Sequence, residues 1–164
     1  MMVVAVRVGQ GFDVHPFCDR DAPGPRALVL GGAVFEGELG LVGHSDADVV
    51  AHACADALLG AAGLGDLGSH FPDDEPALAG ADSMALLAEV ARRVRSAGWE
   101  PVNVDCSVVL EYPVLAPRRA EMQRRLSGAV GADVTIKGKR PEGLGALGRR
   151  EGIACWAVAL VARP

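Results

Sequence analysis

Residues 2–17 read MVVAVRVGQGFDVHPF, and this stretch sets the expectation for the whole fold. Residues 2–8 are rich in valine, which favours a β-strand, and the glycines at positions 9 and 11 are expected to loosen its end. Beyond them, Asp13 and His15 lie two residues apart in an extended segment. Their side chains therefore face one side of the chain, while Val14 faces the other. A carboxylate and an imidazole on one face supply half of a metal site.

A helix is expected to supply the other half, within HSDADVVAHACADALLG at residues 44–60. Asp48 and His52 are four residues apart, so they share one stripe of that helix. His52 together with Asp13 and His15 gives the ligand set of a catalytic zinc ion, which keeps one position open. Asp48 is predicted to orient the imidazole of a liganding histidine. From spacing alone, Asp13 as a turn cap and His15 as an ordinary surface histidine remain alternatives.

The rest of the chain alternates strands with helices. Strands are expected at 27–32, 102–112, 133–137 and 153–162, helices at 46–60, 83–97 and 117–126, and loops at 63–82 and 140–152. Periodicity does not separate helix from strand in the apolar run 153–162, and strand is preferred because it would complete a sheet. With 164 residues, the chain is expected to form a single α/β (α+β) domain, residues 1–164, with one layer of sheet and one of helix.

Composition excludes several classes of protein. The net charge of −5 argues against a nucleic-acid partner, which usually requires a basic excess. No apolar run approaches the roughly 18 residues of a membrane span, and the opening segment is too short for a signal peptide. The four cysteines form no CxxC pair, which favours a reduced cytoplasmic protein with buried thiols.

Three stretches together resemble the 2-C-methyl-D-erythritol 2,4-cyclodiphosphate synthase family. They are RVGQGFDVHPF at 7–17, GLVGHSDADVVAHACADALLGAAGLGDLGSHFPDDEPALAGADS at 40–83 and EGLGALGRREGIACWAVAL at 142–160. The resemblance runs in register from about residue 7 to the end of the chain. It implies a mixed β-sheet with helices on one face, and a homotrimer around a central axis with active sites between neighbouring chains.

The resemblance also implies a phosphorus–oxygen lyase of the non-mevalonate route to isoprenoids and other terpenoids. The substrate of such an enzyme is 4-diphosphocytidyl-2-C-methyl-D-erythritol 2-phosphate. Its 2-phosphate attacks the β-phosphorus, CMP leaves, and 2-C-methyl-D-erythritol 2,4-cyclodiphosphate forms. No nucleophilic side chain is needed, so catalysis consists mainly of positioning and charge neutralisation.

Residue roles follow from the same resemblance. Asp13, His15 and His52 match the ligands of Zn²⁺, or another divalent transition metal, and Glu142 matches the ligand of Mg²⁺ or Mn²⁺ on the substrate diphosphate. His44 is implied as a catalytic contact to the substrate phosphates. The other residues implied in substrate binding are Ser45, Asp66, Leu67, Gly68, Phe71, Asp73, Pro113, Lys139 and Arg149.

Some of these residues also have simpler interpretations. Ser45 is suited to capping the following helix, although a helix start also suits an anion. Asp73 is equally suited to a turn. Arg149 matches a family arginine near the trimer axis, which the resemblance implies as a site for a phosphate or isoprenoid diphosphate; the alternative is an ordinary loop arginine.

The sequence departs from the family pattern in two segments. Lys139, Arg140 and Pro141 stand where a run of threonines is usual. The guanidinium of Arg140 can neutralise developing phosphoryl charge, which makes it a candidate catalytic residue, or it can fill the site or lie on a basic surface loop. In the expected cytosine pocket, Tyr112 replaces a small residue and Val114 replaces a lysine, so Tyr112 either stacks on a base or blocks it.

Two alternatives to the cyclase therefore remain at this stage. One is a divergent paralogue that uses the same zinc site on a different phosphorylated or nucleotidyl substrate. The other is a trimeric metal-binding protein without turnover.

Overall fold

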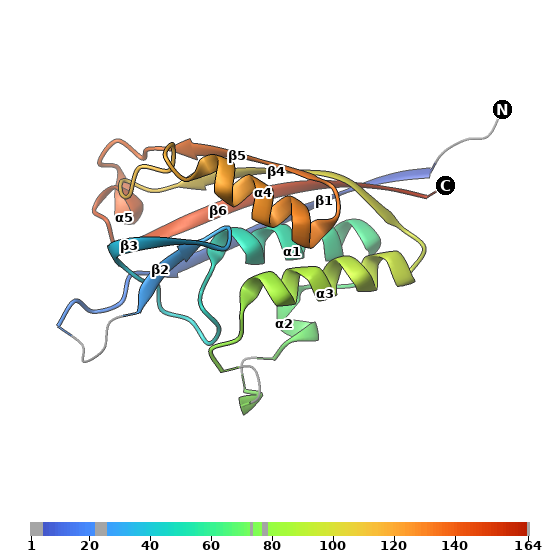
Figure 1. Ribbon diagram of the computed structural model, residues 1–164, viewed down its shortest axis with the longest axis horizontal. Coiled ribbons are helices and arrows are strands. Elements are labelled where there is room, and N and C mark those ends of the chain that lie inside the picture. The colour runs from blue at the N-terminus through green and yellow to red at the C-terminus, as the bar shows by residue number, and fades with distance from the viewer. Residues whose placement is uncertain (1–4, 22–25, 73, 77–78, 164) are drawn as a thin grey trace.

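A four-stranded mixed sheet is the centre of the fold (Figure 1). The computed structural model describes residues 5–21, 26–72, 74–76 and 79–163. The strand order is β1 (Ala5–Pro16), β6 (Gly152–Arg163), β4 (Glu100–Val109) and β5 (Asp133–Lys139). The β1–β6 and β6–β4 pairs are antiparallel, and β4–β5 is parallel. The apolar run near the C-terminus is thus a strand, as predicted.

A separate hairpin joins β2 (Ala27–Leu30) to β3 (Ala33–Leu39). Gly31 and Gly32 make its turn with φ values of 56° and 72°, a left-handed conformation that glycine adopts at little cost. The sequence predicted the first of these strands and missed the second. The two-glycine turn lets the chain fold back at once, and this buries Leu28, Leu30, Ala33 and Phe35.

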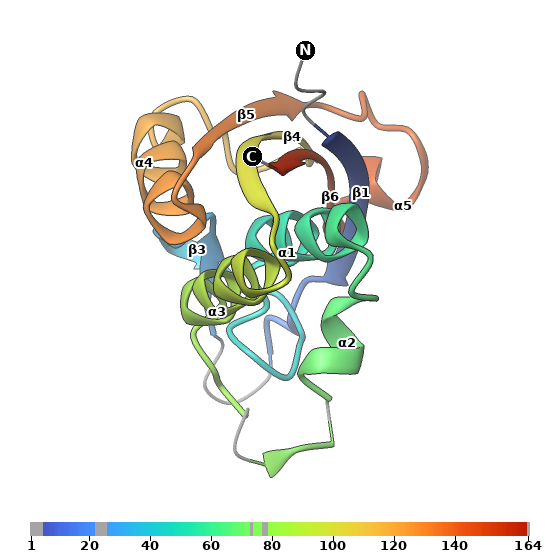
Figure 2. The same ribbon diagram turned by 90° about the vertical axis from the view of Figure 1, so that its right-hand side faces the viewer.

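Helices lie on one side of the main sheet, as Figures 1 and 2 show. The longer helices are α1 (Val49–Ala62), α3 (Ser83–Ser96) and α4 (Arg119–Val130). Helix α1 packs on β1 and β6, α3 packs beside α1, and α4 lies against β5. The short helices α2 (Leu67–His70) and α5 (Gly145–Gly148) fall inside segments predicted to be loops.

Two glycines of β1 set how closely α1 approaches the sheet. A Cβ added to Gly9 would lie 2.1 Å from the carbonyl oxygen of Ala57, and one added to Gly11 would lie 2.0 Å from that of Ala53. The prediction that these glycines loosen the strand is wrong, because β1 continues through them to Pro16. Their missing side chains instead let the α1 backbone rest directly on β1.

The opposite face of β1 and β6 carries exposed apolar side chains. We call this set the apolar sheet face, and it consists of Val6, Val8, Phe12, Val14, Trp156 and Val158. Their exposed fractions range from 39% to 67%. Phe12 and Trp156 are paired across the two strands, with ring centroids 4.7 Å apart. These side chains are exposed in the single chain, and the longer helices α1, α3 and α4 lie on the other side of the sheet (Figure 2).

Candidate active site

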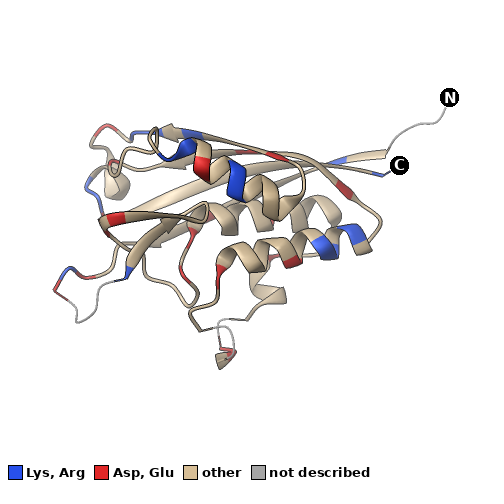
Figure 3. Cartoon of the chain, in the orientation of Figure 1, with Lys and Arg blue, Asp and Glu red and all other residues tan. Residues whose placement is uncertain are grey.

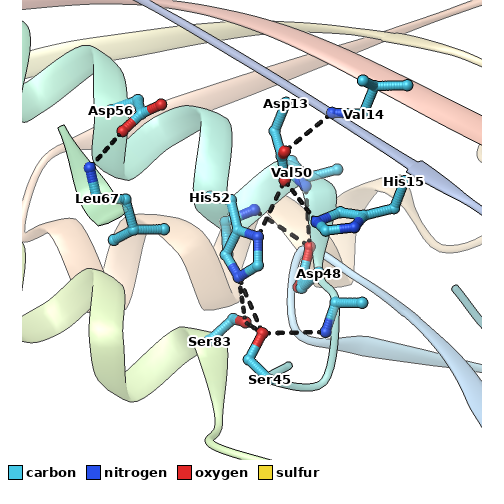
Figure 4. Close-up of polar contacts among 12 residues, drawn as sticks. Asp13, Val14, His15, Ser45, Asp48, Val50, His52, Asp56, Leu67 and Ser83 are labelled. Atoms are coloured by element: carbon cyan, nitrogen blue, oxygen red, sulfur yellow. Dashed lines mark hydrogen bonds and ion pairs between the residues drawn. The ribbon is translucent and has the colours of Figure 1, made fainter. Parts of the chain in front are cut away.

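Asp13, His15 and His52 converge where α1 lies on the end of β1 (Figure 4). The Oδ2 atom of Asp13 lies 3.0 Å from Nε2 of His15 and 2.9 Å from Nδ1 of His52. One ligand atom from each residue lies within 4.8 Å of the others, and no other trio in the described part of the chain meets this condition. Two imidazoles and one carboxylate are a donor set that fits zinc. The sequence predicted these three residues correctly as a cluster.

The carboxyl group of Asp13 is held in its ionised form. Burial by itself would raise the pKa of Asp13, but hydrogen bonds from His15 and His52 outweigh it. The pKa of Asp13 therefore falls well below its usual value. A carboxylate that stays ionised is suited to bind a cation.

Two serines hold the far side of the His52 imidazole. Nε2 of His52 lies 2.8 Å from Oγ of Ser83 and 3.1 Å from Oγ of Ser45. Ser83 in turn donates a hydrogen bond to Asp46. Ser83 is the first residue of α3 but does not cap it, because Asp82 caps that helix by accepting from the backbone of Met84. No local signal in the sequence reveals the role of Ser83, because the contact spans 31 residues.

Asp48 does not orient His52, so that prediction is wrong. The carboxylate is fully buried and accepts hydrogen bonds from four backbone N–H groups, those of Gly31, Gly32, Val50 and Ala51. Asp48 thus caps α1 and fastens the turn of the β2–β3 hairpin to it. Burial raises the pKa of Asp48 to about 6 despite these bonds.

A pocket of about 270 Å³ opens beside the three ligand-type residues. Its other lining residues are Gly43, His44, Ser45, Asp56, Leu67, Gly68, Phe71 and Leu86. Five predicted substrate residues, His44, Ser45, Leu67, Gly68 and Phe71, therefore share one pocket with the predicted metal ligands. Residues 67–71, which comprise α2 and the residue after it, form one wall of this pocket through Leu67, Gly68 and Phe71.

Two further carboxylates shape that wall. Asp56, one turn beyond His52 on α1, accepts a 2.7 Å hydrogen bond from the backbone of Leu67. Asp56 lies on the same helical stripe as His52, and this spacing is the feature of the sequence that indicates its role beside the pocket. Asp66 caps α2 and accepts from the backbone and hydroxyl of Ser69. Predicted residue Asp73 lies outside the described residues.

A second, smaller pocket of about 130 Å³ lies between the segment after β4 and the end of β5. It is lined by Leu110, Glu111, Pro113, Val114, Leu115, Ala116, Arg119, Gly138, Lys139 and Arg140. Predicted residues Pro113, Lys139 and Arg140 are thus brought together. The two pockets share no lining residue, so within one chain the metal cluster and the predicted nucleotide segment are separate.

Comparison with known proteins matches this arrangement to a family. The sequence profile of the YgbB family covers residues 6–162. This chain belongs to the YgbB family. The curated relative from Bordetella petrii, a 2-C-methyl-D-erythritol 2,4-cyclodiphosphate synthase, is 51% identical over 99% of each chain. A relative of the same name from Azoarcus sp. is 53% identical over 96% of each chain.

Solved structures agree with these relatives. The bifunctional IspDF from Campylobacter jejuni superposes with a TM-score of 0.91 at 35% identity, covering 99% of this chain and 43% of that one. IspF from Plasmodium falciparum in complex with CDP gives a TM-score of 0.81 at 28% identity over 96% of each chain. The resemblance to the cyclodiphosphate synthases is confirmed along the full length of this YgbB-family chain.

In this YgbB-family chain, the ring of Tyr112 contacts two arginines, Arg140 and Arg150. Tyr112 is not among the lining residues of the smaller pocket, and the guanidinium of Arg150 lies 4.3 Å from its ring centroid. Tyr112 therefore does not block the pocket from within its own chain. The sequence left both stacking and blocking open for Tyr112, and the structure shows it stacked on an arginine.

Glu111 is a functional candidate that the sequence did not reveal. Its carboxylate, with only 7% of the side chain exposed, accepts from Arg140 at 3.1 Å and from the backbone of Gly143 at 2.7 Å. Glu142 lies between those partners with a left-handed φ of 54°. Glu111 therefore fixes the turn that presents Glu142. Arg149 pairs with Glu151 at 2.6 Å and lines neither pocket described above.

Proposed function

We propose that this chain converts 4-diphosphocytidyl-2-C-methyl-D-erythritol 2-phosphate to 2-C-methyl-D-erythritol 2,4-cyclodiphosphate and CMP. The observation that carries this proposal is the convergence of Asp13, His15 and His52 beside a pocket lined by the family's expected substrate residues. The relatives that match over nearly the whole chain are named for this lyase activity. No comparison favours a paralogue with another substrate.

Asp13, His15 and His52 would hold Zn²⁺, which supplies Lewis acidity to the phosphate oxygens when bound. The protein's own contribution is placement. Ser83 and Ser45 fix the His52 ring from behind, and the close packing of α1 on β1 fixes its distance from Asp13. His44 and Ser45 line the pocket next to this cluster and are assigned to the substrate phosphates, although the buried Ser45 hydroxyl is already bonded to His52 and to the backbone of Ala47.

A homotrimer with active sites between chains is part of the proposal. The apolar sheet face is a large exposed apolar patch, and patches of this kind mark association surfaces. The separate pocket lined by Pro113, Lys139 and Arg140 would complete the site of a neighbouring copy by accepting the cytidine end of the substrate. The structure of a relative in complex with CDP supports a cytidine nucleotide as a ligand of this fold.

The second metal ion and the charged residues Glu142 and Arg140 belong to this proposed nucleotide-binding part of the site. We assign Glu142, on its exposed turn, to Mg²⁺ or Mn²⁺ bound with the substrate diphosphate. The side chain of Arg140 is 61% exposed and lines the pocket, which leaves it able to contact a phosphate while bonded to Glu111. Asp66, Asp73 and Arg149 keep their predicted roles in substrate or phosphate binding as proposals.

We predict that the protein is located in the cytoplasm. None of the described helices is both long and apolar enough to cross a membrane. All four cysteines are free thiols, which supports the reducing cytoplasm as the compartment.

The deciding experiment follows phosphorus resonances while purified protein is incubated with Zn²⁺, Mg²⁺ and the diphosphocytidyl substrate. We expect CMP and the cyclic diphosphate to appear. His52→Ala should lose both bound zinc and turnover. His44→Ala removes an imidazole from the same pocket without removing a ligand, so it should keep stoichiometric zinc and lose turnover. No product from zinc-loaded wild-type protein refutes the activity, and stoichiometric zinc in His52→Ala refutes the ligand assignment.

A further inference from the structure

Arg93 of α3 contacts the wall of the metal pocket from behind. Its guanidinium carbon lies 4.8 Å from the ring centroid of Phe71, which faces the pocket. A terminal nitrogen of Arg93 lies 2.6 Å from Nδ1 of His70, and Nε donates to Glu89 at 2.8 Å. A cation over an aromatic face and two hydrogen bonds together fix one guanidinium in one place. The basic residues of α3 gather toward its C-terminal end (Figure 3).

His70 connects Arg93 to the other end of the wall through two hydrogen bonds. Arginine only donates hydrogen bonds, so Nδ1 of His70 accepts and carries no proton. Nε2 then carries the proton and donates to the carbonyl oxygen of Leu64 at 2.8 Å. The imidazole therefore links α3 to the chain just before α2, while Phe71 links α3 to the chain just after it.

Apart from Arg93 and His70, few hydrogen bonds tie the wall to the rest of the fold, although Leu67 and Phe71 also pack against the hydrophobic core. Helix α2 has only four residues, and none of them is buried. The backbone of Leu67 is tied to Asp56, and the backbone of Phe71 donates to Leu67 within the helix. So short a helix is not stable by itself and depends on its tertiary contacts.

We infer that Arg93 is a positioning residue for the substrate pocket. It holds Phe71 and His70 against α3, and this sets the place of the wall formed by residues 67–71 relative to the metal ligands. Its effect on turnover rests on the proposed function, whereas its effect on the wall does not. Small displacements of groups that position a substrate are costly to catalysis, so the wall must be held firmly.

Arg92 provides a matched control on the same helix. It bonds to the same carboxylate, Glu89, at 2.6 Å, but its side chain is 65% exposed compared with 33% for Arg93. None of the contacts of Arg92 described here reaches α2. Arg92→Ala therefore removes one positive charge from α3 and leaves the wall untouched.

The test compares Arg93→Ala and Arg92→Ala by hydrogen exchange over residues 64–72 and by steady-state kinetics. For Arg93→Ala we expect exchange at the Phe71 amide to accelerate about tenfold, because the opening of this short helix loses its anchor. We expect KM to rise about fivefold, kcat to stay within about twofold and zinc content to stay at wild-type level. Arg92→Ala should match wild type in all four. Because Arg93 acts on the wall through both Phe71 and His70, the KM effects of Arg93→Ala and Phe71→Ala should be less than additive in the double variant.

The experiment distinguishes failure of the proposed function from failure of the role inferred for Arg93. Wild-type exchange and wild-type KM in Arg93→Ala overturn the inference, as do additive KM effects in the double variant. A merely structural role would lower the melting temperature and zinc content without this split between KM and kcat. If wild-type protein shows no turnover, the proposed function fails and the exchange comparison still decides the role of Arg93. If Arg93→Ala does not fold, Arg93→Met keeps the aliphatic stem and is tested in its place.

Discussion

Replacing Asp48 with alanine tests whether this buried carboxylate is structural. Its loss removes the N-cap of α1, which costs about 1 kcal/mol. It also leaves the N–H groups of Gly31 and Gly32 without their acceptor inside the fold, at about 1 to 3 kcal/mol each. The free energy of unfolding should therefore fall by about 4 kcal/mol. In a chain of this size that corresponds to a melting temperature lower by about 12 °C.

The control is Asp82→Ala, because Asp82 caps α3 by a single bond to Met84 from an exposed position. That variant should lose only about 1 kcal/mol. Asp48→Asn should fall between the two, since its amide nitrogen cannot accept from Gly32 while its oxygen still accepts from the α1 backbone. The assay is urea unfolding at one fixed protein concentration, with zinc content measured on each folded variant. A change below about 1.5 kcal/mol in Asp48→Ala, or loss of zinc at unchanged stability, would refute this reasoning.

Three other predictions concern the metal, the nucleotide loop and the assembly. Zn²⁺ at one hundred times its Kd should raise the free energy of unfolding of the wild type by about 2.7 kcal/mol and leave that of His52→Ala unchanged. Equal shifts of the two proteins in calorimetry would count against the ligand set. Glu111→Ala removes the hydrogen-bond acceptor of the Gly143 backbone and loosens the turn that carries Glu142. The Mg²⁺ concentration for half-maximal turnover should therefore rise about tenfold, while the zinc content stays unchanged. An unaltered Mg²⁺ titration would show that Glu111 does not have this role. Trp156→Glu places a charge in the apolar sheet face and should give a zinc-binding monomer by light scattering, whereas an unchanged mass would exclude that face as the interface.

The metal cluster was readable from sequence because each ligand obeys a local rule. Asp13 and His15 share a face through the two-residue period of a strand, and His52 follows from the helical stripe. Their convergence does not follow from those rules. It depends on how closely α1 packs on β1, which Gly9 and Gly11 permit by having no side chain. Spacing suggested the convergence as one of several alternatives, and the family resemblance selected it.

The polar residues around the cluster were harder to assign, because capping and tertiary contact use the same side chains. Asp48 has the spacing of a group that orients His52, yet its oxygens are taken by backbone donors from two elements. Ser83 has the position of a helix cap, yet its hydroxyl holds His52. Near a helix start, local pattern does not decide between these roles, because the hairpin and the helix that provide the competing partners are distant in sequence.

The distribution of altered residues has a physical explanation in the two separate pockets. Tyr112 and Arg140 depart from the family pattern, yet they pack with Arg150 and Glu111 rather than with the metal ligands. Changes in that segment therefore leave the distances among Asp13 and the two histidines intact. In the proposed assembly, they would act on the metal site only where the proposed nucleotide pocket met the metal pocket of a neighbouring copy. Variation in nucleotide binding is thereby separated from the geometry of the metal, and the Mg²⁺ titration and the zinc measurement should respond to different substitutions.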